Sequence, residues 1–356
     1  MNGAPQSATA GRRDASVLGA YVLPGGVRDP RPAIGRAKEI EVLGMGTAWI
    51  GERFDTKDLP ALAGALSQVT SKVEIASGVT PFGLRHPMVL ASMGQTLQSL
   101  SAGRFALGLG RSARWRWTRY GTPAPTLASM RDTAVILRRL WAGETVEYDG
   151  PAGRFPSIRL AERADVAPPP LLLAAVGPRT LALAGASFDG VILHPFLTVD
   201  AVHRSCAIVR DAARQAGRDP HRVRCIATLV VAPDRSAQET DLAIRARAAG
   251  YFHVEGLGDA LIAANGWSAE RLARYRAEPV FADLDGRQAD KALPRQALVE
   301  ASHRLPAQWV ESASASGSST HCAEILHAYL DAGADRILLH GTTPEHLAPM
   351  VRAFTR

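Results

Sequence analysis

Short apolar runs alternate with segments of helical periodicity along most of the chain. Expected strands lie at residues 16–23, 47–51, 73–79, 105–109, 171–176, 190–193, 223–231 and 336–339. Expected helices lie at residues 32–43, 59–70, 87–100, 129–141, 179–186, 202–213 and 320–332. In the third of these helices Val89, Met93 and Leu97 recur every four residues and therefore share one face. Eight strands in strict alternation with helices predict an α/β fold, a closed (β/α)8 TIM barrel.

Three segments extend or interrupt this alternation. Residues 1–15 have no periodic pattern, so we expect a flexible tail followed by a single barrel domain at 16–356. Residues 144–170 are interpreted as a small hairpin excursion. Residues 250–319 form the longest break and end in a Ser-rich stretch, 312–320, that we expect to be mobile. Insertions after barrel strands gather at the C-terminal rim, so 250–319 is interpreted as a cover over the substrate, with plain scaffold as the alternative.

The composition is that of a globular protein. Of the 356 residues 46% are apolar and 21% are charged, which provides a large core and excludes disorder. No apolar run approaches the roughly 20 residues that span a bilayer, and residues 1–14 lack the apolar stretch of a secretory signal. Cys206, Cys225 and Cys322 have spacings that suit neither a disulfide framework nor a metal site. We therefore expect a cytoplasmic protein with no membrane partner and no metal.

The net charge of +7 raises the question of a nucleic-acid partner. The basic residues are spread along the chain, and nearly all are arginine, as in proteins from GC-rich genomes; the lysines are Lys38, Lys57, Lys72 and Lys291. No known recognition motif for DNA or RNA is present. Arginine pairs with planar oxyanions better than lysine does, so the charge favours an acidic small molecule over nucleic acid.

Polar residues follow the expected strands at the ends where barrels carry their catalytic groups. They are Glu52 and Arg53, Thr80, residues 110–112, residues 177–179, His194, and residues 340–342. No metalloprotease helix motif, phosphate-binding P-loop or nucleophile elbow occurs among them. The sequence has no evident nucleophile or metal, which favours chemistry on a bound organic cofactor.

Three motifs become recognisable together. They are SGVTP at 77–81 leading to RHP at 85–87, LSAGRFALGLG at 100–110, and AAVGPR at 174–179 followed by ASFDG at 186–190. Their order and spacing resemble the luciferase-like monooxygenase superfamily, especially its deazaflavin (F420)-dependent oxidoreductase branch, which has many actinobacterial members. The resemblance covers residues 16–235 and the last strand but not 250–319.

The resemblance implies a cofactor site at three strand ends. The bond between Gly78 and Val79, just before Thr80, matches a non-proline cis peptide that supports the back of the ring in the family; an ordinary trans bond is the alternative. Gly108 and Gly110 lack a Cβ, so a ring or phosphate could approach the backbone there, with a packing role as the alternative.

Two further segments suit the anionic part of such a cofactor. Gly177, Pro178 and Arg179 begin a helix whose free amides and dipole favour a phosphate, although they also suit simple helix initiation. Residues 111–120 (RSARWRWTRY) interleave cations with aromatic rings. This loop would suit the phosphodiester and oligoglutamyl tail of F420, with Arg111 as the direct contact. A solvated loop and a platform for single-stranded nucleic acid are the alternatives.

The proton-transfer group is sought at the same rim. Glu52 and His194 are the catalytic candidates, because both follow barrel strands, whereas His86 stands before Pro87 and is interpreted as structural. Family members often have His or Asp near the position of Glu52, and this sequence departs from that pattern. Glu52 could therefore be only a salt-bridge partner, with Arg53 as the expected cation.

These observations predict an oxidoreductase that passes a hydride between F420 and a small organic substrate. The first alternative is an FMN-dependent monooxygenase that uses reduced flavin and O2. The second is a non-catalytic barrel that binds a ligand or nucleic acid. The family tendency to dimerise implies a homodimer, and the sequence does not identify the substrate or the direction of transfer.

Overall fold

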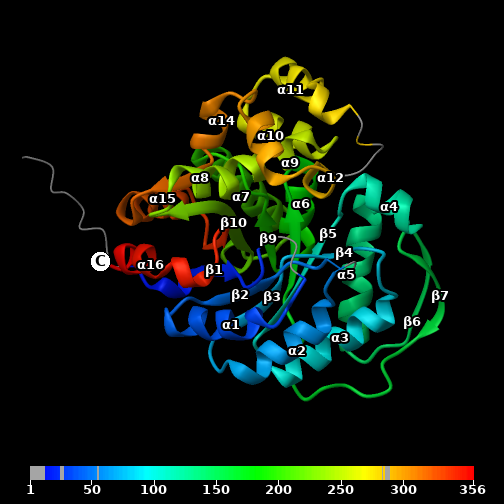
Figure 1. The fold of residues 1–356 in the computed structure, drawn as a ribbon. Coiled ribbons are helices and arrows are strands. Elements are labelled where there is room, and N and C mark those ends of the chain that lie inside the picture. The colour runs from blue at the N-terminus through cyan, green and yellow to red at the C-terminus, as the bar shows by residue number, and fades with distance from the viewer. Residues whose placement is uncertain (1–12, 25–27, 54–55, 283, 285–288) are drawn as a thin grey trace, which may run out of the picture.

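The computed structural model describes residues 13–24, 28–53, 56–282, 284 and 289–356. Eight parallel strands close into a barrel at the centre of the molecule, with helices around it (Figure 1). Neighbouring strands follow chain order, and pairing of the last strand with the first closes the ring. The strands are β1 (Leu18–Tyr21), β2 (Thr47–Ile50), β3 (Glu74–Ser77), β5 (Phe105–Gly110), β8 (Leu171–Ala175), β9 (Gly190–Leu193), β10 (Arg224–Pro233) and β12 (Arg336–His340). The predicted TIM barrel is confirmed.

The helices that cover the barrel bury one apolar face each. In α7 the predicted stripe of Val202, Cys206, Val209 and Ala213 is buried. His86 caps α3, since its Nδ1 accepts a hydrogen bond from the Met88 amide at 3.1 Å, which confirms its structural role. The covering helices are α1 (Pro32–Val42), α2 (Leu59–Val69), α3 (Pro87–Leu100), α5 (Leu127–Trp141), α6 (Pro178–Ser187), α7 (Val199–Gln215), α15 (Ser319–Asp331) and α16 (Ala348–Phe354).

Side chains fill the inside of the barrel. Seven of the eight strands each contribute one buried residue to a single apolar cluster, and Tyr21 of β1 packs against it. The seven are Trp49, Ala76, Ala106, Leu172, Ile192, Ile226 and Leu338. A barrel filled in this way is a packed core and not a pore, so a ligand site is expected at its rim.

Both expected insertions contain regular structure. The first holds the predicted hairpin, β6 (Val146–Gly150) antiparallel to β7 (Gly153–Ile158). The second begins before the expected residue 250, because helices follow β10 from Ala237 onward, and they lie on the same side of the barrel as α4 (Arg114–Tyr120) in Figure 1. They are α8 (Ala237–Thr240), the π-helical η3 (Asp241–Arg245), α9 (Ala246–His253), α10 (Leu257–Asn265), α11 (Ala269–Arg276), η4 (Pro279–Phe281), α12 (Ala289–Ala292), α13 (Arg295–Ser302) and α14 (Ala307–Glu311).

The expected mobility of residues 312–320 is wrong. Ser314–Gly317 form β11, which pairs in parallel with the last four residues of β10, and Ala313 and Ala315 are fully buried. These small side chains are buried through the pairing of β11 with β10, so burial here does not need an apolar run.

The remaining elements are short. They are η1 (Ala15–Val17), β4 (Thr80–Pro81), η2 (Pro220–Arg222) and η5 (Pro344–His346). Of the expected tail, residues 1–12 lie outside the described residues, and Ala15 is buried in the core. No helix within the described part of the chain has the length and apolarity that a bilayer crossing requires.

Candidate functional site

The end of β3 is held from two sides. The peptide bond between Gly78 and Val79 is cis, as the resemblance implies. Tyr21 Oη donates a hydrogen bond to Gly78 O at 2.6 Å, and the Glu52 amide donates to Val79 O at 3.2 Å. Thr80 then pairs with the end of β5 through β4. Residues 78–80 are therefore fixed between the ends of β1, β2 and β5.

Gly108 and Gly110 differ in what fills the space beside them. A Cβ on Gly108 would lie 2.0 Å from Ser77 O, so its absence lets β5 approach β3. A Cβ on Gly110 would lie 2.5 Å from Val79 Cγ2. Gly108 thus has the packing role that was the alternative in the sequence analysis. Gly110 instead leaves space for the side chain of Val79.

The loop after β5 and the first turn of α4 each hold one buried polar atom without a partner among the residues that the structure describes. Ser112 has a positive φ of 63°, and neither its Oγ nor Trp115 Nε1 has a hydrogen-bond partner in the described part of the chain. Arg111 is exposed, and its guanidinium lies 5.6 Å from the ring of Trp117. Two unsatisfied donors beside an exposed cation suit an anionic ligand, because buried polar groups normally have partners.

The start of α6 lies next to this loop. β8 pairs with β5, so the segment after β8 and the segment after β5 leave the barrel side by side. Gly177 is the N-cap of α6 without a side-chain cap, Pro178 is the first helical residue, and Arg179 is exposed. Pro178 has no amide proton, and the amides of Thr180 and Leu181 donate to Gly177 O at 3.0 Å. In this first turn the Arg179 amide, which has no hydrogen-bond partner among the described residues, is the group that can bind an anion.

Glu52 belongs to a buried ion pair. Its Oε1 accepts from Arg85 Nη2 at 2.5 Å, and its Oε2 accepts from Arg85 Nη1 at 2.7 Å and from Thr80 Oγ1. The Glu52 side chain is fully buried, and this bonding raises the pKa of Arg85. The expected pairing of Glu52 with Arg53 is wrong: the cation comes from the loop after β4, 33 residues away in sequence.

His194 lies in an aromatic group at the ends of β9 and β12. Its ring is 4.6 Å from that of Tyr251 in α9, and Tyr251 Oη is 3.5 Å from His340 Nε2. The ring of His340 is in turn 4.7 Å from that of Tyr21. Burial lowers the pKa of His194 to about 4, so the imidazole is neutral near pH 7. Its Nδ1 lies 2.9 Å from Pro195 O, a contact that a neutral ring makes by donating its proton, which leaves Nε2 as an acceptor.

A family comparison covers nearly the whole chain. A family model described as luciferase-like monooxygenase matches residues 9–336. The chain belongs to this luciferase-like family. The match includes residues 250–319, over which the sequence motifs alone showed no resemblance.

Relatives of this luciferase-like protein include named reductases and dehydrogenases. 5,10-Methylenetetrahydromethanopterin reductase of Methanolobus tindarius is 30% identical over 235 residues, which are 65% of this chain and 69% of that protein. F420-dependent hydroxymycolic acid dehydrogenase of Mycobacterium tuberculosis is 32% identical over 47% of this chain and 48% of that protein, about half its length. The solved coenzyme F420 dependent tetrahydromethanopterin reductase from Methanopyrus kandleri has a TM-score of 0.75 at 19% identity, covering 94% of this chain and 96% of that one. This likeness shows a shared fold.

Sequence reasoning missed three residues of the luciferase-like site. Tyr21 lies within the first strand, where an aromatic residue is expected in the core. Arg85 was visible as part of the RHP motif, but no spacing rule connected it to Glu52. Tyr251 belongs to the insertion, which the motifs do not cover.

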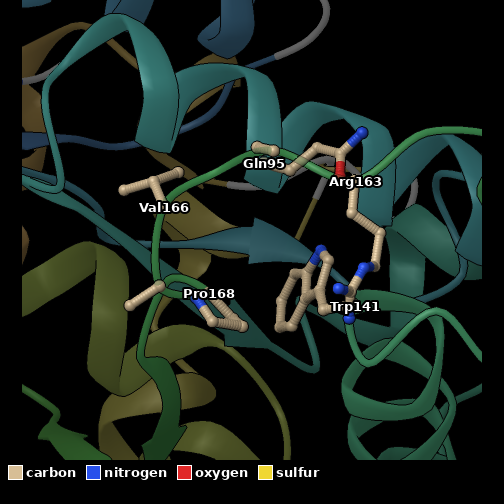
Figure 2. Close-up of a pocket in the computed structure, with 7 residues that line it drawn as sticks. Gln95, Trp141, Arg163, Val166 and Pro168 are labelled. Atoms are coloured by element: carbon tan, nitrogen blue, oxygen red, sulfur yellow. The ribbon is translucent and has the colours of Figure 1, made fainter.

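A hollow on the luciferase-like barrel lies away from these groups. Figure 2 shows Trp141 and Arg163 beside Pro168. Pro168 belongs to the segment that leads into β8, whose first residue is Leu171. The hollow is therefore near the amino ends of the strands. The groups described above follow the carboxyl ends, where barrel enzymes carry their active sites.

Proposed function

We propose that this protein is an F420-dependent oxidoreductase that passes a hydride between the deazaflavin ring and a carbon atom of a small organic substrate. The observation that carries the proposal is the relative named for F420, taken with the family motifs at the neighbouring strands β3, β5 and β8. The cofactor's chemistry would supply the hydride donor or acceptor, and the chain's residues would bind, orient and exchange protons.

The residues that would hold F420 follow these strands. Gly78, Val79 and Thr80 would support the ring, with Gly110 leaving space for Val79 and Gly108 keeping β5 against β3. Arg111, with Gly177, Pro178 and Arg179, would face the phosphate and the acidic tail. The unsatisfied Ser112 Oγ and Trp115 Nε1 support this assignment, because an anion would satisfy both donors.

His194 is the group best suited to exchange a proton with the substrate. The contact with Pro195 O fixes its tautomer, and burial keeps it neutral at pH 7, so Nε2 can accept a proton from a hydroxyl group. When the substrate is reduced instead, Nε2 would first take up a proton from solvent and then donate it to the developing alkoxide. This role requires a substrate whose reacting carbon carries an oxygen.

Glu52, the second catalytic candidate, lies in a different environment from His194. Both of its oxygens are occupied by Arg85, and one also accepts from Thr80. We propose that Glu52 positions Thr80, and through it the ring-supporting segment, while His194 exchanges the proton.

Parallel titrations with F420 and FMN test the proposal. Each cofactor is added to the purified chain while protein fluorescence is followed, and F420 is then incubated with a panel of alcohols while its absorbance is recorded. We expect F420 to bind at least tenfold more tightly than FMN and an alcohol to bleach it. A chain that binds neither cofactor contradicts the proposal.

The alternative function is that of a reduced-FMN monooxygenase. The description of the matching family favours it, since that family is named for monooxygenases. Tighter binding of FMN than of F420, together with substrate-dependent consumption of O2, would assign this function instead.

A further inference from the structure

Two arginines are tied to consecutive carbonyls of the π-helical turn η3. Arg247 in α9 donates through Nη1 to Ala243 O, and Arg295 at the start of α13 donates through Nη2 to Leu242 O. The turn therefore brings guanidinium groups from two helices next to each other. π-Helical turns are rare and often mark functional sites.

A third arginine comes from the barrel itself. Arg53 follows Glu52 at the end of β2, and its charge acts on Arg247 and Arg295. Burial, together with the charges of Arg295 and Arg53, lowers the pKa of Arg247 to about 10. His340, whose pKa falls through burial, also experiences all three positive charges. The three side chains thus share one region beside His340 and Tyr251.

No carboxylate within the described ranges forms an ion pair with any of these three arginines. Among the described residues, Asp290 in α12 is an acidic residue whose charge reaches Arg247 and Arg295, and it is exposed. Arg245, two residues before Arg247, is by contrast paired with Asp241 at 3.1 Å. Three cations held close together repel one another, and an anion bound between them would relieve this repulsion.

The cluster lies across the barrel mouth from the segments assigned to the cofactor's anions. Arg53 follows β2, and the helices that carry Arg247 and Arg295 follow β10. Arg111 and Arg179 follow β5 and β8. In the closed ring β2 and β10 are separated by β1 and β12, on the side opposite to β5 and β8. An anion bound by the cluster would therefore be distinct from the phosphate and tail of the cofactor.

We propose that Arg53, Arg247 and Arg295 bind an oxyanion of the substrate, a carboxylate or a phosphate group. Guanidinium groups match both anions through paired N–H donors. Tyr251 lies one helical turn after Arg247, and its ring contacts His194. A substrate anchored by its anion would therefore extend along Tyr251 toward His194, where the proton is exchanged. The inference rests on the proposed function, because it identifies the anion as part of the substrate.

Anion binding without cofactor tests the cluster by itself. Inorganic phosphate and acetate are titrated separately into the purified chain by calorimetry, at constant ionic strength set with chloride. We expect saturable binding of at least one of the two anions, weakened tenfold or more in Arg247→Gln and in Arg295→Gln. Tighter binding of phosphate indicates phosphate-bearing substrates, and tighter binding of acetate indicates carboxylates.

Arg271→Gln is the matched control, because it removes one positive charge from exposed α11 and should leave anion binding unchanged. Arg247→Lys should recover part of the affinity by restoring the charge. F420 affinity should remain near that of wild type in every variant, and thermal unfolding shows that each is folded. Absence of saturable anion binding, or a loss of anion affinity in Arg271→Gln equal to that in the cluster variants, overturns the inference. Failure of F420 to bind overturns the proposed function, but the anion titrations can still be interpreted.

Discussion

A Cβ on Gly110 would lie only 2.5 Å from Cγ2 of Val79. The end of β5 and the residue after Gly78 therefore interlock, and the space that glycine leaves is filled by protein. Gly108, two residues earlier, faces the Ser77 carbonyl of β3 instead. One glycine thus keeps two strands together, and the other fits the rim segment that we assign to the cofactor ring.

Replacement of Gly110 by Val should weaken F420 binding by tenfold or more. The branched side chain must displace Val79, while the barrel strands beneath it keep their pairing. Fluorescence titration measures the affinity, and circular dichroism checks the fold. Gly35→Ala is the control: nothing lies within 4 Å of its Cβ position in α1, so affinity should not change. Normal cofactor affinity in Gly110→Val would refute the assignment of this strand end.

Arg111→Ala and Arg179→Ala should each raise the F420 dissociation constant about tenfold at low salt. Each loses one charge-assisted contact to an anion, which is worth about 1.5 kcal/mol or more. Both side chains are exposed, so the loss should shrink at high salt as screening increases. Arg352→Ala, on the exposed side of α16, is the control. Unchanged affinity in both variants at low salt would remove these segments from the cofactor site.

Glu52→Gln and Arg85→Gln should behave alike. Each breaks the same buried pair and leaves one charge without its partner, so each should lower the free energy of unfolding by about 3 kcal/mol. If Glu52 positions Thr80, both variants should also lose turnover to a similar extent, about ten- to hundredfold. The comparison requires urea unfolding and steady-state kinetics. A turnover loss confined to Glu52→Gln would instead assign proton transfer to this carboxylate.

His194→Gln should lower turnover at least a hundredfold with little change in F420 affinity. Glutamine retains a hydrogen-bonding side chain but cannot accept the substrate proton. His221→Gln, at an exposed position of η2, removes a histidine elsewhere and should have no effect. Full turnover in His194→Gln would exclude the imidazole as the proton-transfer group.

The barrel was predictable because each strand is an apolar run and each covering helix has an apolar face. α3 has the bounds that the sequence predicts, and β8 differs by one residue. β11 was missed for a physical reason: Ser-Ala-Ser-Gly contains no apolar run, and its burial arises from pairing with β10 more than 80 residues earlier in sequence.

The site was less predictable than the fold. Strand-end positions located Glu52 and His194 at the rim, but contacts between distant segments decide what surrounds them. Arg85 reaches Glu52 from the following loop, although Arg53 is its neighbour in sequence. Tyr251 contacts His194 from the insertion after β10, and the barrel motifs in the sequence do not indicate where the helices of this insertion pack. Side-chain pairing across such separations leaves no local signal.

The pH dependence of stability should report the burial of His194. Burial lowers the pKa of His194 to about 4, whereas an unfolded histidine has a pKa of about 6.5. Between these values the unfolded chain binds a proton that the folded chain does not, so the free energy of unfolding falls as pH decreases from 6.5 to 4. Above pH 6.5 this group makes no contribution to the slope. In His194→Gln that part of the slope is absent, so the stability advantage of wild type over the variant should shrink by about 1–2 kcal/mol between pH 7 and pH 5. Other buried histidines, such as His340, titrate in both proteins and cancel in the difference. Urea unfolding of both proteins at pH 7 and pH 5 measures this difference in the free energy of unfolding. A difference that is the same at both pH values would show that His194 titrates in the folded protein as it does in the unfolded chain.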